Sequence, residues 1–468
     1  MTAAFSPALL RAAFLQTRTV GPAGARLVVH LGLALLFMLT TIWLNSGTLS
    51  PLSATPTPRM LLDCGYTGNT DHAESLKLFW MLKGYPVSEW GDSIYLRRLL
   101  YPLLAFPFFS LFGFVIGGFV ANCLIHAVTL IGLGWFLFVT LGRRGAVAGV
   151  WLFATWPGVF YWAALPYAHA TIVPITVWGF MLLHVLSQRR GALMVGAACF
   201  GLGVLCQAYD LLVYFGPAAL GLMAWCNRRP GALVLGLAGL VLPSLITAAV
   251  VLHVFHAPTL FNDNTGVYGV ILGSYIDILR GTVDWRGWFG LILEAPSVLV
   301  QVFFDSGFSV LPALGLLLAL LNIRLRLVRF HPAELAFGAA LLAVFLFNNL
   351  APPYQGWQMR GDWIARLYSP LFIVFLFFTA RMIAEARSRG LGVRLVVAVP
   401  LLAAVALNAA LSLGGFLAKW DMTSLVIYRF YHTVDARMYI RHLDTYGRRP
   451  LGFCVRDGHW PSPYRGGD

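Results

Sequence analysis

The sequence is poor in charged residues, and poorest of all in lysine. Only 11% of its 468 residues are charged and 59% are hydrophobic, whereas ordinary soluble domains carry about 25% charged residues. Lysine occurs only at Lys77, Lys83 and Lys419, so arginine supplies almost all of the positive charge. So few charges cannot cover a water-facing surface, and the composition therefore excludes the soluble protein classes.

Paired cysteines are also missing. The six cysteines are scattered and lack the short spacings that bind zinc or iron–sulfur clusters.

The formal net charge of +14 comes from arginines that form short clusters between apolar runs and do not follow one polar face. Membrane topology explains such clusters better than a polyanionic partner does, so we expect no nucleic-acid partner.

Long apolar runs dominate the chain. A membrane-spanning helix needs about 20 mostly apolar residues, and the pattern predicts an all-α polytopic membrane protein with about eleven such helices. The predicted spans lie near residues 27–46, 115–140, 146–163, 169–187, 191–207, 210–226, 231–253, 298–321, 334–350, 367–385 and 393–414. The basic lead 1–26 precedes a span with no clear cleavage site, so we expect it to be retained.

Residues 99–114 are apolar but contain Pro102 and Pro107. If this segment lies on the membrane surface, all arginine clusters share the side of the N-terminus, and if it spans, all of them face the other side. The positive-inside rule therefore favours a surface segment, a cytoplasmic N-terminus and an external C-terminus. The clusters are Arg143-Arg144, Arg189-Arg190, Arg228-Arg229, Arg324-Arg326-Arg329 and Arg381-Arg387-Arg389.

This threading divides the chain into a transmembrane domain over 27–414 and an external tail over 415–468. It leaves external loops at 47–114, 254–297 and 351–366, which mix aromatic, glycine and charged residues. Ordinary connectors with interfacial Trp and Tyr have the same composition. The first of these loops holds the most informative polar residues.

From Asp71 the first external loop has the apolar spacing of an amphipathic helix, which Gly84 ends. Asp71 and Glu74 lie in its first turn, one above the other. Carboxylates at that position interact favourably with the helix dipole. Local evidence alone therefore favours a capping role for both.

The order of short motifs along the chain indicates a family. After the acidic helix start come Lys-Gly-Tyr-Pro at 83–86 and an arginine before Leu-Tyr-Pro-Leu-Leu at 100–104. Leu-Phe-Ala-Thr-Trp-Pro-Gly at 152–158, Gly-Leu-Gly-Val-Leu-Cys-Gln at 201–207 and Arg-Leu-Tyr-Ser-Pro at 366–370 follow. This order resembles the GT-C membrane glycosyltransferases, the superfamily of mannosyltransferases and aminoarabinose transferases that use polyprenyl-phosphate sugars. The resemblance covers most of the membrane part.

The resemblance implies that Asp71 is the base that deprotonates an acceptor hydroxyl. Arginines near the spans would stabilise the departing phosphate, although anchoring to headgroups explains any single arginine equally well. Two positions depart from the family pattern, since His72 replaces a second acidic residue and Gln207 replaces an arginine. The candidate substrate-binding residues are His72, Glu74, Arg97, Arg98, Tyr101, Tyr167, His169, Gln207, Asp210, Arg360, Arg366 and Tyr368.

No cofactor is specified by the sequence. His72 with Glu74, or His169, offers ligands for a divalent metal ion, but no spacing defines a site. The loop 254–297 fits either a second lid over the donor site or a simple interfacial helix. Cys64 and Cys454 are the only cysteines predicted outside the cytoplasm, and we expect them to form a disulfide there.

The sequence thus predicts a glycosyltransferase on the external face of a bacterial inner membrane, surrounded by membrane lipids. It would move a monosaccharide from a polyprenyl-phosphate donor to a glycan, lipid or protein acceptor. A transporter or lipid flippase is the alternative, but the polar residues concentrate in external loops and the two halves do not match. A non-catalytic envelope-assembly partner, which needs no base, is the third interpretation.

Overall fold

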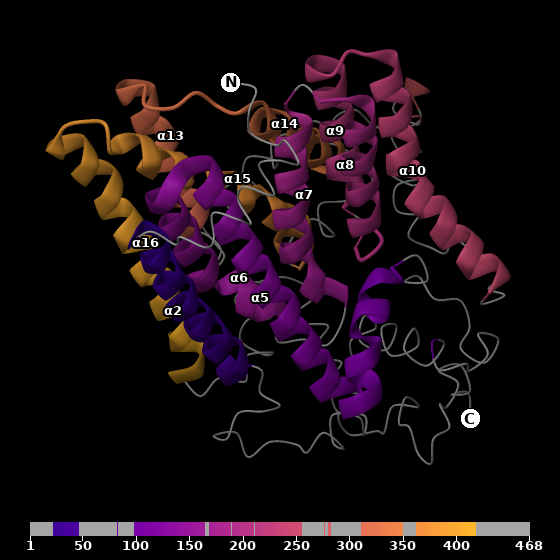
Figure 1. Cartoon of the computed structure of the whole chain (residues 1–468), viewed down its shortest axis with the longest axis horizontal. Helices are drawn as coiled ribbons and strands as arrows, with labels where there is room; N and C mark the ends of the chain where they lie inside the picture. Colours follow the sequence, from indigo (N-terminus) through magenta and orange to yellow (C-terminus); the bar gives the residue numbers. More distant parts are fainter. Residues whose placement is uncertain are drawn as a thin grey trace.

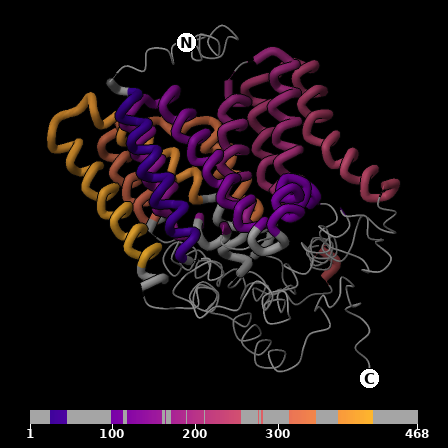
Figure 2. The backbone as a smooth tube through the Cα atoms, turned by 60° about the horizontal axis from the view of Figure 1, so that its bottom comes forward, coloured from indigo at the N-terminus to yellow at the C-terminus, as the bar shows by residue number. Residues whose placement is uncertain are grey.

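A computed structural model gives the architecture of the chain. The residues that it describes are 22–45, 82, 98–163, 168–188, 190–209, 211–254, 276, 279–281, 310–349 and 362–417. Within these ranges the backbone is helical apart from short connectors, and Figures 1 and 2 show the helices side by side in one bundle.

The helices follow the apolar runs closely. They are α2 (Pro22–Asn45), α5 (Leu100–Thr155), α6 (Pro157–Ala163), η3 (Ala168–Thr171), α7 (Ile172–Leu186), α8 (Ala192–Leu205), α9 (Leu212–Cys226), α10 (Pro230–His253), α13 (Val310–Leu325), α14 (Pro332–Asn349), α15 (Asp362–Ala386) and α16 (Leu391–Leu417). Helix occupies nearly all of the described part of every predicted span, and the described residues include no strand, which confirms the helical class.

Four stretches are long and apolar enough to cross a membrane: Gly24–Leu44, Gly117–Thr155, Pro230–His253 and Leu391–Leu413. Many large apolar side chains on these helices point outward, for example Leu402, which is 66% exposed. An apolar outer surface of this kind fits a lipid environment. The protein is therefore a helical membrane protein, while the count of eleven spans stays a prediction.

The helix α5 reverses direction twice within its continuous run, as its ribbon shows in Figure 1. A Cβ added to Gly117 would lie 2.3 Å from the carbonyl oxygen of Phe108, and one on Gly134 would lie 3.0 Å from a methyl of Val150. Residues so far apart in sequence cannot touch within one straight helix. Gly142, with φ of 75°, marks the second reversal.

The first reversal adds detail to residues 99–114, for which a surface segment stays a prediction. Leu100–Phe112 forms a helical arm that packs against the next part of α5, with Tyr101, Ala105 and Phe109 at most 1% exposed. Its spacing of four residues puts these side chains on one face. At 1.5 Å per residue the arm is about 20 Å long, which is shorter than the roughly 30 Å hydrocarbon core.

Glycines allow α8 and α10 to approach closely. A Cβ on Gly203 would lie 2.8 Å from the carbonyl oxygen of Leu240, and one on Gly239 would lie 2.5 Å from that of Gly196. Small residues at helix interfaces serve this purpose in membranes, where packing drives helix association. Helix packing is thus a sufficient reason for the glycines of the 201–207 motif.

The arginine-bearing turns meet at one end of the bundle. The turn at Gly142 and the end of α15 line one cavity, and Arg381 donates to the carbonyl oxygen of Arg329 at 2.7 Å. The backbone amide of Arg190 donates to Oδ1 of Asn227 at 2.9 Å, and Asn227 directly precedes the arginine pair 228–229. This arrangement agrees with the predicted threading, and the assignment of this end to the cytoplasm remains a prediction.

Candidate functional site

The described part of the predicted site gathers where α8 ends beside the start of α5. The amide of Leu100 donates to the carbonyl oxygen of Gln207 at 3.3 Å. The guanidinium carbon of Arg98 lies 4.4 Å from the centroid of the Tyr209 ring. Arg98 is 6% exposed and Tyr209 5%, so the cation and the ring form a desolvated cation–π pair, worth about 2 kcal/mol.

This position lies at the end of the bundle opposite to the arginine-bearing turns. The helix α8 begins beside Arg190 and ends at Leu205, and Gln207 follows one residue after its C-cap, Cys206. Arg98 is therefore held apart from the arginine clusters, at a helix end where the bundle meets the predicted external interface.

The side chain of Gln207 has a structural role. Its Nε2 donates to the carbonyl oxygen of Gly203 and to the hydroxyl of Ser244 on α10, both at 3.1 Å. The amide thereby joins the end of α8 to α10. Gln207 consequently contributes to the site through its backbone carbonyl, which positions the start of α5.

The hydroxyl of Tyr101 is part of a buried chain of hydrogen bonds. The sequence analysis named Tyr101 as a candidate but did not identify Asn122 and His126, the other side chains of this chain. The Tyr101 hydroxyl donates to Oδ1 of Asn122 at 2.9 Å, and Nδ2 of Asn122 donates to the carbonyl oxygen of Ala163 at 3.0 Å. The backbone carbonyl of Asn122 also contacts Nδ1 of His126 at 2.9 Å. Polar residues four apart inside an apolar run are rare in membranes, so this spacing in the sequence could have identified Asn122 and His126.

Replacing Asn122 by leucine should destabilise the protein by about 1–3 kcal/mol for each buried polar group left unpaired. The groups affected are the Tyr101 hydroxyl and the Ala163 carbonyl. Thermal unfolding in detergent measures the change. Thr140→Val is the matched control, because this exposed hydroxyl bonds only within its own helix turn. Equal melting temperatures for the two variants would contradict the role of this chain.

The structure brings the backbone beside Arg98 to Gln207, whereas the hydroxyl of Tyr101 is bound to Asn122. It describes the other predicted residues only in part. His169 lies in η3, and Arg366 and Tyr368 lie in the first turns of α15; only their backbones are described. Asp71, His72, Glu74, Arg97, Tyr167, Asp210 and Arg360 lie outside the described residues, as do Cys64 and Cys454.

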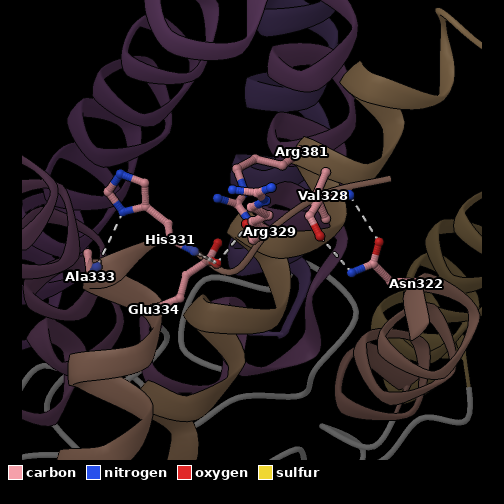
Figure 3. A network of polar contacts seen from close by, with 7 residues as sticks. All are labelled: Asn322, Val328, Arg329, His331, Ala333, Glu334 and Arg381. Carbon is pink, nitrogen blue, oxygen red and sulfur yellow. Dashed lines mark hydrogen bonds and ion pairs between the residues drawn. The ribbon is translucent and has the colours of Figure 1, made fainter. Parts of the chain in front are cut away.

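A second polar cluster lies at the arginine-bearing end (Figure 3). Nη2 of Arg381 is 3.0 Å from Oε2 of Glu334, and the same oxygen accepts the amide of His331 at 2.8 Å. Asn322 holds the adjoining connector, since its Nδ2 donates to the carbonyl oxygen of Val328 at 2.8 Å. These contacts tie the segment between α13 and α14 to α15.

A histidine pair extends this cluster. The rings of His184 and His331 stack with centroids 4.1 Å apart and planes 6° from parallel. His184 is 8% exposed and Glu334 2%, so ionisable groups are buried inside the bundle. These groups lie outside the predicted external loops, most of whose residues are not described. The cluster lies near helix ends, and Oε2 of Glu334 and Nη2 of Arg381 are paired within it, so it fits a structural role.

Stability should fall as the pH falls from about 6.5 to about 4, because His331 must remain neutral in the folded state. Burial first, and the positive Arg381 second, lower the pKa of His331 from 6.5 to about 4, so the unfolded chain binds more protons in this window. His331→Asn keeps an acceptor for the amide of Ala333, which now donates to Nδ1 of His331. Unfolding measured against pH should show a smaller loss in this variant, and an unchanged slope would contradict the assignment.

Among the described residues no group of three or more His, Cys, Asp or Glu side chains is placed to hold a metal ion. The candidate ligands His72 and Glu74 lie outside those residues, and the side chain of His169 is not described. The chain matches no protein-family model, and no curated protein or solved structure is significantly similar to it.

Proposed function

We propose that this membrane protein is a glycosyltransferase of the GT-C type, which moves a monosaccharide from a polyprenyl-phosphate donor to a lipid-linked or cell-envelope acceptor. The observation that carries the proposal is the buried Arg98 over Tyr209, joined by the Leu100 amide to the end of α8. Two motifs of the family resemblance, about a hundred residues apart, meet at this point. Arginine side chains bind phosphate groups through paired hydrogen bonds, which is the role that the resemblance implies for an arginine here.

In the proposed reaction the Asp71 carboxylate removes the proton from an acceptor hydroxyl. That oxygen attacks the anomeric carbon, and the bond from this carbon to the phosphate oxygen breaks. The polyprenyl phosphate leaves with the bonding electrons, and Arg98 stabilises its charge. A low-dielectric site strengthens this electrostatic contribution, because water competes less for the phosphate.

The test is transfer of radiolabelled sugar from polyprenyl-phosphate donors by the purified full chain in lipid. Arg98→Gln should raise the KM for the donor roughly ten- to hundredfold, since a hydrogen bond to a charged group contributes about 1.5–3 kcal/mol. Arg228→Gln is the control, because Arg228 is exposed at the other end of the bundle. An unchanged KM in the Arg98 variant would remove Arg98 from donor binding, and vectorial solute movement without transfer would favour a transporter.

A further inference from the structure

A cavity of about 430 Å³ opens between α2, α5, α15 and α16, at the end of the bundle away from Arg98. Five arginines line it, and they come from four different helices or turns. They are Arg26, Arg143, Arg144, Arg387 and Arg394. Within the described part of the chain no carboxylate lies among its lining residues. The cavity is therefore strongly cationic, and its size is typical of a small-ligand site.

The other walls of the cavity are apolar. Ala398, Leu401, Leu402 and Val405 of α16 form one side, and Trp151 of α5 forms part of the other, with its indole Nε1 donating to Nδ1 of His30 at 3.2 Å. An ordinary solvated arginine cluster has no such walls. This cavity offers a cationic end and an apolar end to one ligand.

The apolar end continues onto the outer surface of the bundle. Leu402 lines the cavity and is 66% exposed, and Leu395 and Val399 on the same helix are 52% and 58% exposed. These side chains form the apolar outer face of a helix that is long enough to cross a membrane. A ligand in the cavity can therefore extend alkyl chains along α16 into the surrounding lipid.

We propose that this cavity binds an anionic phospholipid, with the phosphate at the arginines and the acyl chains along α16. Arginine forks bind phosphate through paired hydrogen bonds, and basic pockets between transmembrane helices on the cytoplasmic side take anionic headgroups. Nothing in this assignment depends on sugar transfer, because Arg98 lies at the opposite end of the bundle.

The binding test uses detergent-purified full chain with phosphatidylglycerol, phosphatidylcholine or inorganic phosphate at constant ionic strength. Phosphatidylglycerol should raise the melting temperature and stay bound in native mass spectrometry, whereas phosphatidylcholine and inorganic phosphate should do neither. The double variant Arg387→Gln with Arg394→Gln should bind phosphatidylglycerol roughly tenfold or more weakly. A melting shift of the same size with inorganic phosphate alone would overturn the lipid assignment.

Two further variants distinguish lipid binding in the cavity from an effect of general surface charge. Arg228→Gln with Arg229→Gln removes the same charge from exposed positions at the same end of the bundle, outside the cavity, and should leave lipid binding unchanged. Ala398→Trp should fill the cavity without changing charge and weaken binding as the arginine variant does. Equal weakening in both arginine double variants, or full binding in Ala398→Trp at an unchanged melting temperature without lipid, would overturn the proposal.

Discussion

Replacing Asp71 by asparagine is expected to reduce sugar transfer by about 10²–10⁴-fold while donor binding survives. A positioned base typically contributes a factor of this size, because it removes the acceptor proton as the new bond forms. Asparagine has the shape of aspartate but cannot accept that proton at neutral pH. The rate of transfer should therefore fall much more than the affinity for the donor.

The predicted loop that contains Asp71 also provides the control for the Asp71 experiment. Asp92→Asn removes a carboxylate from the predicted first external loop but lies outside the motif that the resemblance identifies, so its turnover should match that of the unaltered chain. Glu74→Gln should have an intermediate effect, since Glu74 follows Asp71 by three residues in the helix that the sequence predicts. Equal turnover in the Asp71 and Asp92 variants, at equal folding, would leave helix capping as the role of Asp71.

Sequence reasoning located the helices well because membrane spans are defined by composition. The apolar runs 231–253 and 393–414, for example, correspond to α10 and α16 within a few residues. The arginines that separate such runs also predicted which turns share an end of the bundle. Both signals are local, and both follow from the cost of placing charge in hydrocarbon.

The arm of α5 was not predictable in the same way. Pro102 and Pro107 suggested a broken surface segment, but Pro102 lies in the first turn of the helix, where the missing amide has no helical partner to lose. What fixes the arm is the contact of Tyr101 with Asn122, which lies 21 residues further along the chain. Such pairing depends on tertiary packing, and no local pattern encodes it.

The candidate site shows the same limit. The 201–207 motif pointed to Gln207, yet its side chain joins α8 to α10 and only its carbonyl contacts the start of α5. Arg98 lies over the ring of Tyr209, two residues after Gln207, and the sequence gave no reason to choose this tyrosine. Assigning roles within a motif requires the directions of side chains, and these follow from the complete packing.

Glu334 and Arg381 provide the largest expected effect on stability. Arg381→Met should destabilise the protein by about 3–5 kcal/mol. The substitution removes the positive charge that pairs with the Glu334 carboxylate, whose side chain is only 1% exposed. Arg381 also donates to the carbonyl oxygen of Arg329, so its loss releases the connector between α13 and α14 as well. Equilibrium unfolding of the purified protein in mixed micelles measures the change.

The double variant Arg381→Met with Glu334→Gln should recover most of that loss. Glutamine is uncharged and keeps an oxygen that can accept the amide of His331, so no buried charge remains and this amide keeps its acceptor. Non-additivity of this kind identifies a direct pair. Arg389→Met, an exposed position just beyond the end of α15, should change stability by less than about 0.5 kcal/mol. If Arg381→Met changed stability as little as Arg389→Met, the burial of the Glu334 carboxylate would not control the stability of this end of the bundle.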